Sequence, residues 1–463
     1  MNEQNNTTLG ECADILSGGT RYKKVQLLEI GAKTRKAFAM GPFGSNIKQE
    51  YYQPQGIPVV RGVNLGDGPF RSADFVYLSP DKANELRASW AFPSDLVFVA
   101  QGTVGKVGII PGESQEPFYV LSQNLMKFSC DTKKACPLYL YYYFVSHIGQ
   151  HEILSYVNPT GVPCISQPLS SLKKFQVPLP SLPQQKVIAH VLGTLDDKIE
   201  LNRRMNETLE AMARAIFKSW FVDFDPVKAK AEGKTPKGLS PEIANLFPDS
   251  LADSSLGPIP VGWCIKKLPE AIEVNPRRTL RRGETAPYLD MKNMPTSSAR
   301  AGSIYDREFG SGTKFMNGDV LLARITPCLE NGKTAYVDFL GAGQVGWGST
   351  EYIVLRSRRP LPLEYAYFLS RSDQFREHAI QNMTGTSGRQ RVPASCFDQY
   401  EIVVPSEPVA TAFGAFAQTA MAKMKANDEE SGTLASIRNT LLPRLLSGEI
   451  RIKDAEEFVG DRM

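Results

Sequence analysis

The chain has 463 residues, of which 42% are hydrophobic and 22% charged, and its formal net charge is only +4. At about 150 residues per domain this length predicts about three units, and the charged fraction excludes a wholly disordered chain. The seven cysteines are odd in number and form no CxxC pair, which argues against a disulfide framework or zinc ribbon. Since the sequence shows neither a run of about 18 apolar residues nor a signal-peptide pattern, we expect a cytoplasmic protein without a membrane span.

A long internal repeat, offset by about 225 residues, organises the chain. Phe175–Pro183 resembles Tyr400–Pro408 with its prolines in register, and Asp95 matches Asp319 at the head of an apolar run. A Gly-Lys pair follows each run. A repeat of this length is too long for a solenoid unit, so it predicts two copies of a domain, each followed by a helix.

The first copy occupies residues 1–183, and a helix is predicted in residues 184–222. Its apolar seam has the heptad spacing of a coiled coil, with Asn202 near the middle. The matching seam in the C-terminal helix and tail, residues 409–463, has Asn427 at the same place but contains Gly432 and Pro443. Either each helix packs on its own domain, or the two helices pair and the asparagines fix their register. The asparagines alone do not set the direction of pairing.

A linker is predicted between the two copies, in residues 223–262, because this segment is rich in proline, glycine and serine. It is compatible with a short helix near Pro241–Phe247. The second domain is predicted in residues 263–408. In both domains short β-rich runs alternate with Gly and Pro turns and a few helices, which indicates an α+β fold with mixed or antiparallel sheets.

Motifs of the common enzyme classes are incomplete in this sequence. Gly332-Lys333-Thr334 ends like a phosphate loop, but Pro327 occupies the position of the required earlier glycine. Residues 339–343 have the shape of a methyltransferase cofactor loop, yet the Pro-Pro-aromatic motif that would hold a flipped base is missing. His147 and His151 are spaced as helical metal ligands, but no third ligand is obvious, and aromatic neighbours favour a packed face. We therefore predict no catalytic residue and no metal site.

Basic and amide side chains interleaved with aromatic ones are the candidate DNA contacts. Arginine reads guanine, an amide reads adenine, and both types bind phosphates. For any single residue a solvated surface charge is the favoured alternative, and for the cluster 277–282 the two interpretations stand equal. The candidates are Lys48, Arg61, Asn64, Lys106, Arg277, Arg278, Arg281, Arg282, Lys292, Asn293, Lys333, Arg389, Gln390 and Arg391.

Several segments resemble the specificity subunits of type I restriction-modification enzymes, and together they span nearly the whole chain. Some are similar to the opening of that family's target-recognition domains and others to its helical regions. They are Gly41–Lys48 with Gly56–Asn64, Pro287–Met294, Pro178–Gln185 running into Leu195–Asn202, Ile216–Pro226, and Leu441–Ile450. The plain divergence of the second helix from the first is a departure from the family pattern.

The resemblance implies two target-recognition domains joined by two long helices in an antiparallel coiled coil, with a pseudo-two-fold repeat. Each domain would read one half of a bipartite, asymmetric target in double-stranded DNA. Two methyltransferase subunits would use S-adenosylmethionine to methylate adenine, and motor-nuclease subunits would use ATP and magnesium. The chain itself would be non-catalytic and hold no cofactor. Phe217, Trp220 and Phe221 are candidate partner contacts, although core packing against the linker is an equal alternative for Trp220.

Three other functions are compatible with the sequence. A stand-alone DNA-binding protein is disfavoured, because such proteins usually gain two-fold symmetry by dimerising. A single chain that both recognises and methylates DNA is disfavoured by the missing Pro-Pro-aromatic motif. A non-catalytic adaptor that never contacts DNA is the third.

Overall fold

A computed structural model describes residues 22–450, apart from residues 34–35, 67, 71–74, 159–160 and 387. Residues 1–21 of the predicted first domain and residues 451–463 of the predicted C-terminal tail lie outside the described part of the chain. The chain divides into two compact units, one made of the residues up to Glu200 with those from Ser431 onward, and one of Leu201–Glu430. In the described part of the chain, no helix combines the length and apolar character needed to cross a bilayer.

Unit 1 contains a two-stranded ribbon, two four-stranded sheets and a short hairpin, with helices against them. Its helices are α2 (Pro80–Glu85), α3 (Pro137–Val145), α4 (His147–Leu154), α5 (Pro168–Lys174), the first half of α6 (Leu182–Phe221) and the last part of α12 (Glu407–Ser447). Its strands are β1 (Lys24–Gln26), β2 (Phe38–Met40), β3 (Ile57–Val60), β4 (Val76–Leu78), β5 (Trp90–Ala91), β6 (Leu96–Val99), β7 (Val107–Ile109), β8 (Tyr119–Leu121), β9 (Leu125–Phe128), β10 (Val157–Asn158), β11 (Cys164–Ile165) and β12 (Gln176–Pro178).

Unit 2 has a corresponding set of elements, preceded by two short helices and a hairpin. Its helices are the second half of α6, α7 (Asp225–Ala231), α8 (Pro241–Ala244), α9 (Leu268–Ala271), α10 (Tyr365–Arg371), α11 (Asp373–Gln381) and the first part of α12. Its strands are β13 (Leu251–Ala252), β14 (Ile259–Pro260), β15 (Cys264–Lys267), β16 (Ile272–Val274), β17 (Thr285–Leu289), β18 (Tyr305–Glu308), β19 (Thr313–Phe315), β20 (Val320–Ala323), β21 (Thr334–Tyr336), β22 (Gly346–Gly348), β23 (Tyr352–Ser357) and β24 (Glu401–Val404).

Strand order is the same in the two units. The sheet β4-β3-β8-β5 of unit 1 matches β18-β17-β22-β19 of unit 2, and β2-β9-β6-β7 matches β16-β23-β20-β21. The ribbons β1-β12 and β15-β24 also match. Among the described residues, each unit has one parallel pair, and it lies in the first of these sheets: β3 with β8 and β17 with β22. The predicted internal repeat is therefore confirmed, and it extends to the strand topology.

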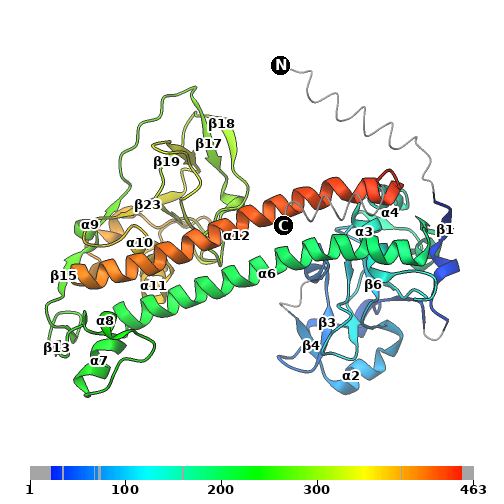
Figure 1. The fold of residues 1–463 in the computed structure, drawn as a ribbon, viewed down its shortest axis with the longest axis horizontal. Helices are drawn as coiled ribbons and strands as arrows, with labels where there is room; N and C mark the ends of the chain where they lie inside the picture. Colours follow the sequence, from blue (N-terminus) through cyan, green and yellow to red (C-terminus); the bar gives the residue numbers. More distant parts are fainter. Residues whose placement is uncertain are drawn as a thin grey trace. The chain divides into compact units, whose positions relative to one another are not determined.

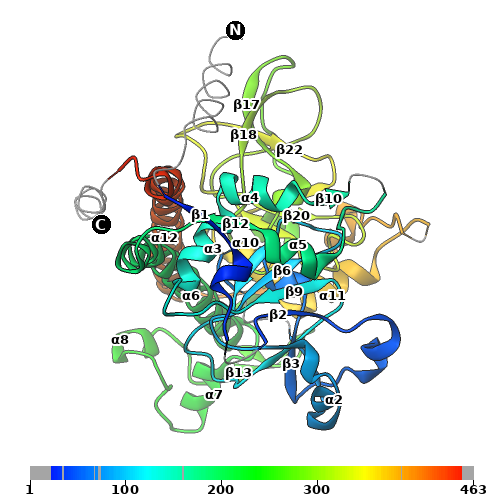
Figure 2. The same cartoon turned by 90° about the vertical axis from the view of Figure 1, so that its right-hand side faces the viewer.

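The central strand β6 explains why its sequence is apolar without alternation. Leu96 and Phe98 face a core that also includes α3 and α6, whereas Val97 and Val99 face a second, smaller core. Because both faces of the strand are buried, all four residues are apolar. The matching strand β20 divides two cores in the same way. Figure 2, in which unit 1 faces the viewer, shows α3 between β6 and α6.

The helices α6 and α12 pair in an antiparallel coiled coil (Figure 1). In unit 2, Asn202 Nδ2 donates to Asn427 O at 3.3 Å, Asn206 Nδ2 donates to Met424 O at 3.3 Å, and Phe217 packs edge-on against Phe413. Residue numbers thus rise along one helix as they fall along the other. In unit 1 the same direction brings Arg438 to Asp196. The predicted pairing is confirmed, and the structure supplies the direction that the asparagines left open.

Buried polar groups fix the register of this coiled coil. Asn202 and Asn427 are each 1% exposed. Asn427 Nδ2 donates to Asn206 Oδ1 at 2.8 Å, and Asn202 Nδ2 donates to Glu430 Oε2 at 2.7 Å. A one-residue slip would separate these partners, so the register is specified at some cost in stability. The helix α12 continues through Pro443, because Leu441, Leu442, Leu445 and Leu446 on either side are buried in the core of unit 1.

Residues 223–262 carry more regular structure than a bare linker. Besides α8, they hold α7 and the hairpin β13-β14. Aromatic contacts fix them in place: Trp220 packs edge-on against Phe247 at 5.0 Å, and Phe224 against Trp263 at 5.7 Å. This packing bears directly on the predicted partner contacts described below.

Candidate nucleic-acid interface

Equivalent 3₁₀ turns follow β3 and β17 and carry predicted contact residues. They are η4 (Gly62–Asn64) in unit 1 and η6 (Met291–Asn293) in unit 2. Lys106, just before β7, lies against Gly66 beside the first turn, and Lys333, just before β21, donates from Nζ to Met291 O at 2.7 Å. The structure thus brings one predicted lysine to the same turn in each unit. Arg61 precedes the first turn, and Lys292 is exposed in the second.

The turn asparagines have structural roles. Asn64 is fully buried, and its Oδ1 accepts a hydrogen bond from Arg61 N at 2.9 Å, which closes the turn. Asn293 is half-buried and donates from Nδ2 to Ser303 O at 2.7 Å. A buried amide must satisfy its own hydrogen bonds within the fold. The expectation that Asn64 presents its side chain to DNA is therefore corrected.

Arg371 holds the segments on both sides of Lys333. Only 4% exposed, it donates to the carbonyls of Gly332 at 3.0 Å and Thr334 at 3.2 Å, and to Ser298 O at 2.6 Å. Its Nε donates to Tyr367 OH, which in turn donates to Glu210 on α6 at 2.6 Å. Burial raises the pKa of Glu210, and the Tyr367 hydrogen bond and the Arg371 charge oppose that rise. The lysine is positioned through α10 from the long helix α6.

The arginine cluster in the loop between β16 and β17 contains three exposed side chains and one that is held in an ion pair. Arg277, Arg281 and Arg282 are exposed. Arg278 is half-buried and pairs through Nη2 with both oxygens of fully buried Asp319, at 2.9 and 3.2 Å. The first three have guanidinium groups available to DNA, whereas Arg278 is held in place.

The second predicted basic loop, residues 389–391, lies between α11 and β24. Arg389 is exposed, and the backbone of Gln390 accepts a hydrogen bond from Thr326 N at 3.0 Å. Arg391 pairs with Glu351 at 2.8 Å. Lys48 is also exposed, and its Nζ lies 3.4 Å from Oε1 of Glu50. Both residues precede β3, and the next predicted contact, Arg61, follows that strand.

A polar cavity of about 300 Å³ lies beside the first basic loop of unit 2. Arg278 lines it together with Lys314 and Arg324, and Arg324 lies 4.0 Å from the same Glu351 that holds Arg391. Sequence reasoning missed Lys314 and Arg324. The available signal was weak: a single basic residue within or directly after a short apolar run. Their proximity depends on strand pairing that is not visible in the chain order.

Arg307 on β18 is a further basic residue that sequence reasoning missed. Its guanidinium lies 4.9 Å from the ring centre of Tyr288 on β17 and 5.5 Å from that of Trp347 on β22. Arg307 is exposed although these cation–π contacts orient it. Burial raises the pKa of Tyr288, with the adjacent Arg307 opposing the rise. In unit 1, burial likewise raises the pKa of Tyr52, against the effect of Arg61.

The three aromatic residues predicted to contact partners belong to the core of unit 2. Phe217, Trp220 and Phe221 are 3%, 4% and 6% exposed, and all three rings pack against Phe413 of α12. This burial corrects the prediction, because the chain's own aromatic side chains already cover them. The core alternative considered for Trp220 is the one that the structure supports.

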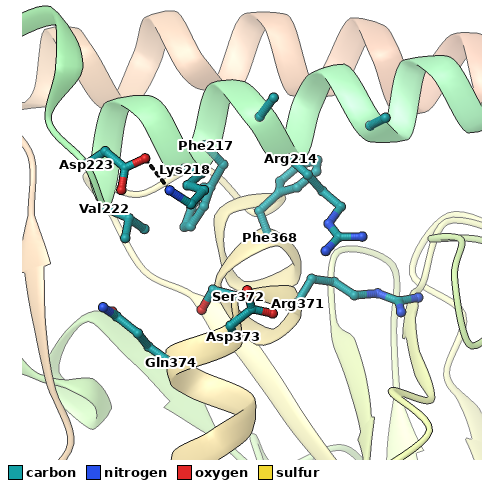
Figure 3. Close-up of a pocket in the computed structure, with 12 residues that line it drawn as sticks. Arg214, Phe217, Lys218, Val222, Asp223, Phe368, Arg371, Ser372, Asp373 and Gln374 are labelled. Atoms are coloured by element: carbon teal, nitrogen blue, oxygen red, sulfur yellow. Dashed lines mark hydrogen bonds and ion pairs between the residues drawn. The ribbon is translucent and has the colours of Figure 1, made fainter.

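A cavity of about 480 Å³ opens beside this core, between α6 and the pair α10–α11 (Figure 3). Phe217 and Phe368 line it between Arg214 and Lys218 of α6 on one side and Gln374 of α11 on the other. Lys218 forms an ion pair with Asp223 at its edge. Within the described residues no group of three or more His, Cys, Asp or Glu side chains is arranged to hold a metal ion.

Comparisons with known proteins give one consistent result. Residues 44–211 match the family model described as "Type I restriction modification DNA specificity domain". The chain is similar to the type I restriction enzyme HindI specificity subunit of Haemophilus influenzae, with 23% identity over 90% of this chain and 99% of that one. It is also similar to the EcoEI specificity subunit of Escherichia coli, with 31% identity over 43% of this chain and 34% of that one.

A solved structure also has a similar fold. The crystal structure of the type I restriction-modification system S subunit from M. genitalium aligns with a TM-score of 0.52. The alignment has 15% identity and covers 92% of this chain and 96% of that chain. At this identity the likeness concerns the fold alone.

Proposed function

Because the chain belongs to the family of type I restriction-modification specificity subunits, we propose that it is the DNA-reading subunit of such a complex. Each unit reads one half of a bipartite target. One observation carries this proposal: in equivalent places at the end of equivalent strands, Lys333 bonds to the 3₁₀ turn η6 and Lys106 lies at Gly66, just after the 3₁₀ turn η4. The side chains around this common frame differ, with Arg61 in unit 1 where unit 2 has Asp290. Two divergent readers on one chain predict an asymmetric target.

The proposal includes the division of labour within the complex. This chain supplies sequence recognition and no catalysis, and it works in the cytoplasm. Two methyltransferase subunits bind S-adenosylmethionine and methylate adenine, and motor-nuclease subunits use ATP and magnesium. The charged groups at the edge of the cavity between α6 and α10–α11, among them Arg214 and Lys218, support a docking role for unit 2. A stand-alone DNA-binding protein remains the alternative.

The test of this function is a map of methylated bases. The chain is co-expressed with its neighbouring methyltransferase gene in a host without DNA methylation, and modified bases are located by single-molecule sequencing. We expect methyladenine in both halves of a split, asymmetric motif. The matched control expresses the methyltransferase alone and should give no methylation. The same motif in both cultures, or none in the presence of an assembled complex, would refute the reading function.

Removing the exposed arginines of the β16–β17 loop is expected to weaken DNA binding. The variant replaces Arg277, Arg281 and Arg282 with Gln and keeps Arg278, because its ion pair with Asp319 is structural. Each lost phosphate contact lowers the slope of log affinity against log salt by about 0.9, so the slope falls by up to roughly 2.7. Fluorescence anisotropy of a labelled duplex between 50 and 300 mM KCl measures it.

The control for this loop carries an equal change in charge. It replaces Lys267, Arg358 and Arg359, which are exposed near the opposite end of β23 and β16, with Gln. We expect its affinity and slope to match those of the unaltered chain. Equal behaviour of the two triple variants would remove the loop from the DNA interface.

A further inference from the structure

The polar cavity of about 300 Å³ beside the β16–β17 loop in unit 2 has an unbalanced charge. Its three charged lining side chains are Arg278, Lys314 and Arg324, and its other lining residues are neutral, among them Thr313 and Thr350. No carboxylate belongs to the lining within the described residues. A polar recess of this composition favours an anion.

Nearby carboxylates are too few to neutralise these cations. Asp319 is shared by Arg278 at 2.9 Å and Arg356 at 2.7 Å. Glu351 is shared by Arg391 at 2.8 Å and Arg324 at the longer distance of 4.0 Å. Lys314 lies over the ring of Phe309 at 4.8 Å, and no carboxylate pairs with it among the described residues. Four arginines therefore share two carboxylates and Lys314 has none, so five positive charges stand against two negative ones, an excess of three.

Two guanidinium donors at the cavity also lack acceptors. The Nε atoms of Arg278 and Arg324 are buried, and neither has a hydrogen-bond partner in the described part of the chain. Buried donors in folded proteins are normally paired, so each such exception needs an explanation. An anion bound in the cavity provides acceptors where the fold supplies too few.

The unit 1 positions that correspond to Lys314, Arg324 and Arg391 are neutral. By strand register, Lys314 corresponds to Trp90, since each pairs with the matching residue of β22 or β8. Arg324 corresponds to Ala100, because the carbonyl of Arg324 accepts a hydrogen bond from Val392 N and that of Ala100 accepts one from Ile165 N. Arg391 corresponds to Cys164, because Arg391 forms an antiparallel bridge with Ile325 and Cys164 forms the matching bridge with Gln101. The charged cavity is thus a feature of unit 2 that the repeat does not require.

We propose that the cavity lined by Arg278, Lys314 and Arg324 binds one backbone phosphate of DNA beside the half-target read by unit 2. This inference rests on the proposed function. Arg277, Arg281 and Arg282 are exposed on the loop that also carries Arg278 of the cavity lining. Several cationic side chains on one loop fit a chain of phosphates better than a single free anion. A phosphate held here positions unit 2 on the duplex without reading a base.

The test uses Lys314→Gln and Arg324→Gln in the complex reconstituted with its methyltransferase partner. The probe is a labelled 30-base-pair duplex of mixed sequence, and affinity is measured from 50 to 300 mM KCl. We expect each variant to lower the salt slope by about 0.9, and the affinity near 0.1 M salt roughly eightfold, the effect of one lost phosphate contact. Arg359→Gln, an equal loss of charge away from the cavity, should change neither.

Because a backbone contact carries no base information, the methylated motif should stay the same in both variants. An unaltered salt slope in Lys314→Gln and Arg324→Gln, with DNA binding intact, would overturn the cavity assignment. A change in one half of the motif would also overturn it, because the residue would then read a base. Failure of the unaltered complex to bind the duplex would instead refute the proposed function.

Thermal melting checks that each variant is folded. If Arg324→Gln unfolds, Lys314→Gln still decides the question, because in the described structure Lys314 contributes a cation–π contact and no ion pair.

Discussion

Replacing residues 1–180 with the matching segment of another specificity subunit is expected to change one half of the methylated motif completely and leave the other half unaltered. The junction lies between the end of β12 at Pro178 and the start of α6 at Leu182. It keeps both long helices and the whole of unit 2. If base contacts come from the globular part of each unit, the exchange transfers one reader and nothing else. Mapping methylated bases gives the result directly.

The structure sets a condition for this exchange. The core of unit 1 includes residues of both long helices, among them Ile188, Leu192 and Leu195 of α6 and Leu441 and Leu445 of α12. The donor segment must therefore present a matching apolar face on its α3, where Leu138 and Tyr142 now meet α6. A poorly matched donor would leave a cavity or a clash, which typically costs about 1–5 kcal/mol.

The reciprocal exchange is the matched control. Replacing residues 263–405, which run from the start of β15 to the end of β24, should alter the half of the motif that the first exchange left unchanged. New bases in both halves after either exchange would show that the two readers are not independent. Such a result would contradict the modular model while leaving the family membership intact.

Most of the architecture was predictable from local sequence patterns. The heptad seam around Asn202 and the prolines before Leu182 depend on near neighbours in the chain, so helix α6 was predictable. The repeat was visible because Asp95 and Asp319 keep the same role: each accepts a hydrogen bond from the backbone three residues earlier and pairs with a buried or half-buried cation. Buried strands such as β6 were recognisable by their apolar composition alone.

The sequence did not predict which side chains are buried or held in ion pairs, because these contacts join segments that are distant in the chain. Arg278 looks like its exposed neighbour Arg277 in sequence, but Asp319, 41 residues away, holds it. Trp220 at a helix end suits an interface or a core equally well, and only the packing of Phe247 and Phe413 decides between them. Arg324, in contrast, was not predicted as a contact at all. Its surroundings depend on a loop more than 60 residues later in the chain, where Arg391 bridges to the adjacent Ile325.

Loss of the Asp95 carboxylate is expected to be among the most destabilising single changes in unit 1. Asp95 is fully buried, and its Oδ2 lies 2.7 Å from Nζ of Lys127, which is 1% exposed. It also accepts a hydrogen bond from Phe92 N at 2.9 Å. Asp95→Ala removes the charge that compensates a buried ammonium, which costs about 3–5 kcal/mol. That is a large share of the roughly 5–15 kcal/mol that stabilises a typical domain.

Hydrogen exchange measured by mass spectrometry on the full chain is the appropriate readout, since two units need not unfold together. Amides of β6 and β9 should exchange faster by about two to four orders of magnitude, following from that free energy. Amides of β20 and β23 in unit 2 provide the internal reference and should keep their rates. Glu85→Ala, which removes a partner from the exposed Lys82–Glu85 pair, should leave both regions unchanged.

A double variant separates the pair's attraction from the cost of an unpaired charge. Lys127→Met removes the ammonium and keeps an apolar side chain of similar length, so Asp95→Ala combined with Lys127→Met leaves no buried charge at the site and lacks the Phe92 hydrogen bond just as Asp95→Ala alone does. We expect the double variant to protect β6 and β9 better than Asp95→Ala alone, because burying no charge costs less than burying one unpaired charge. Equal exchange in the double and single variants would mean that the loss comes from the Phe92 hydrogen bond and the local turn instead.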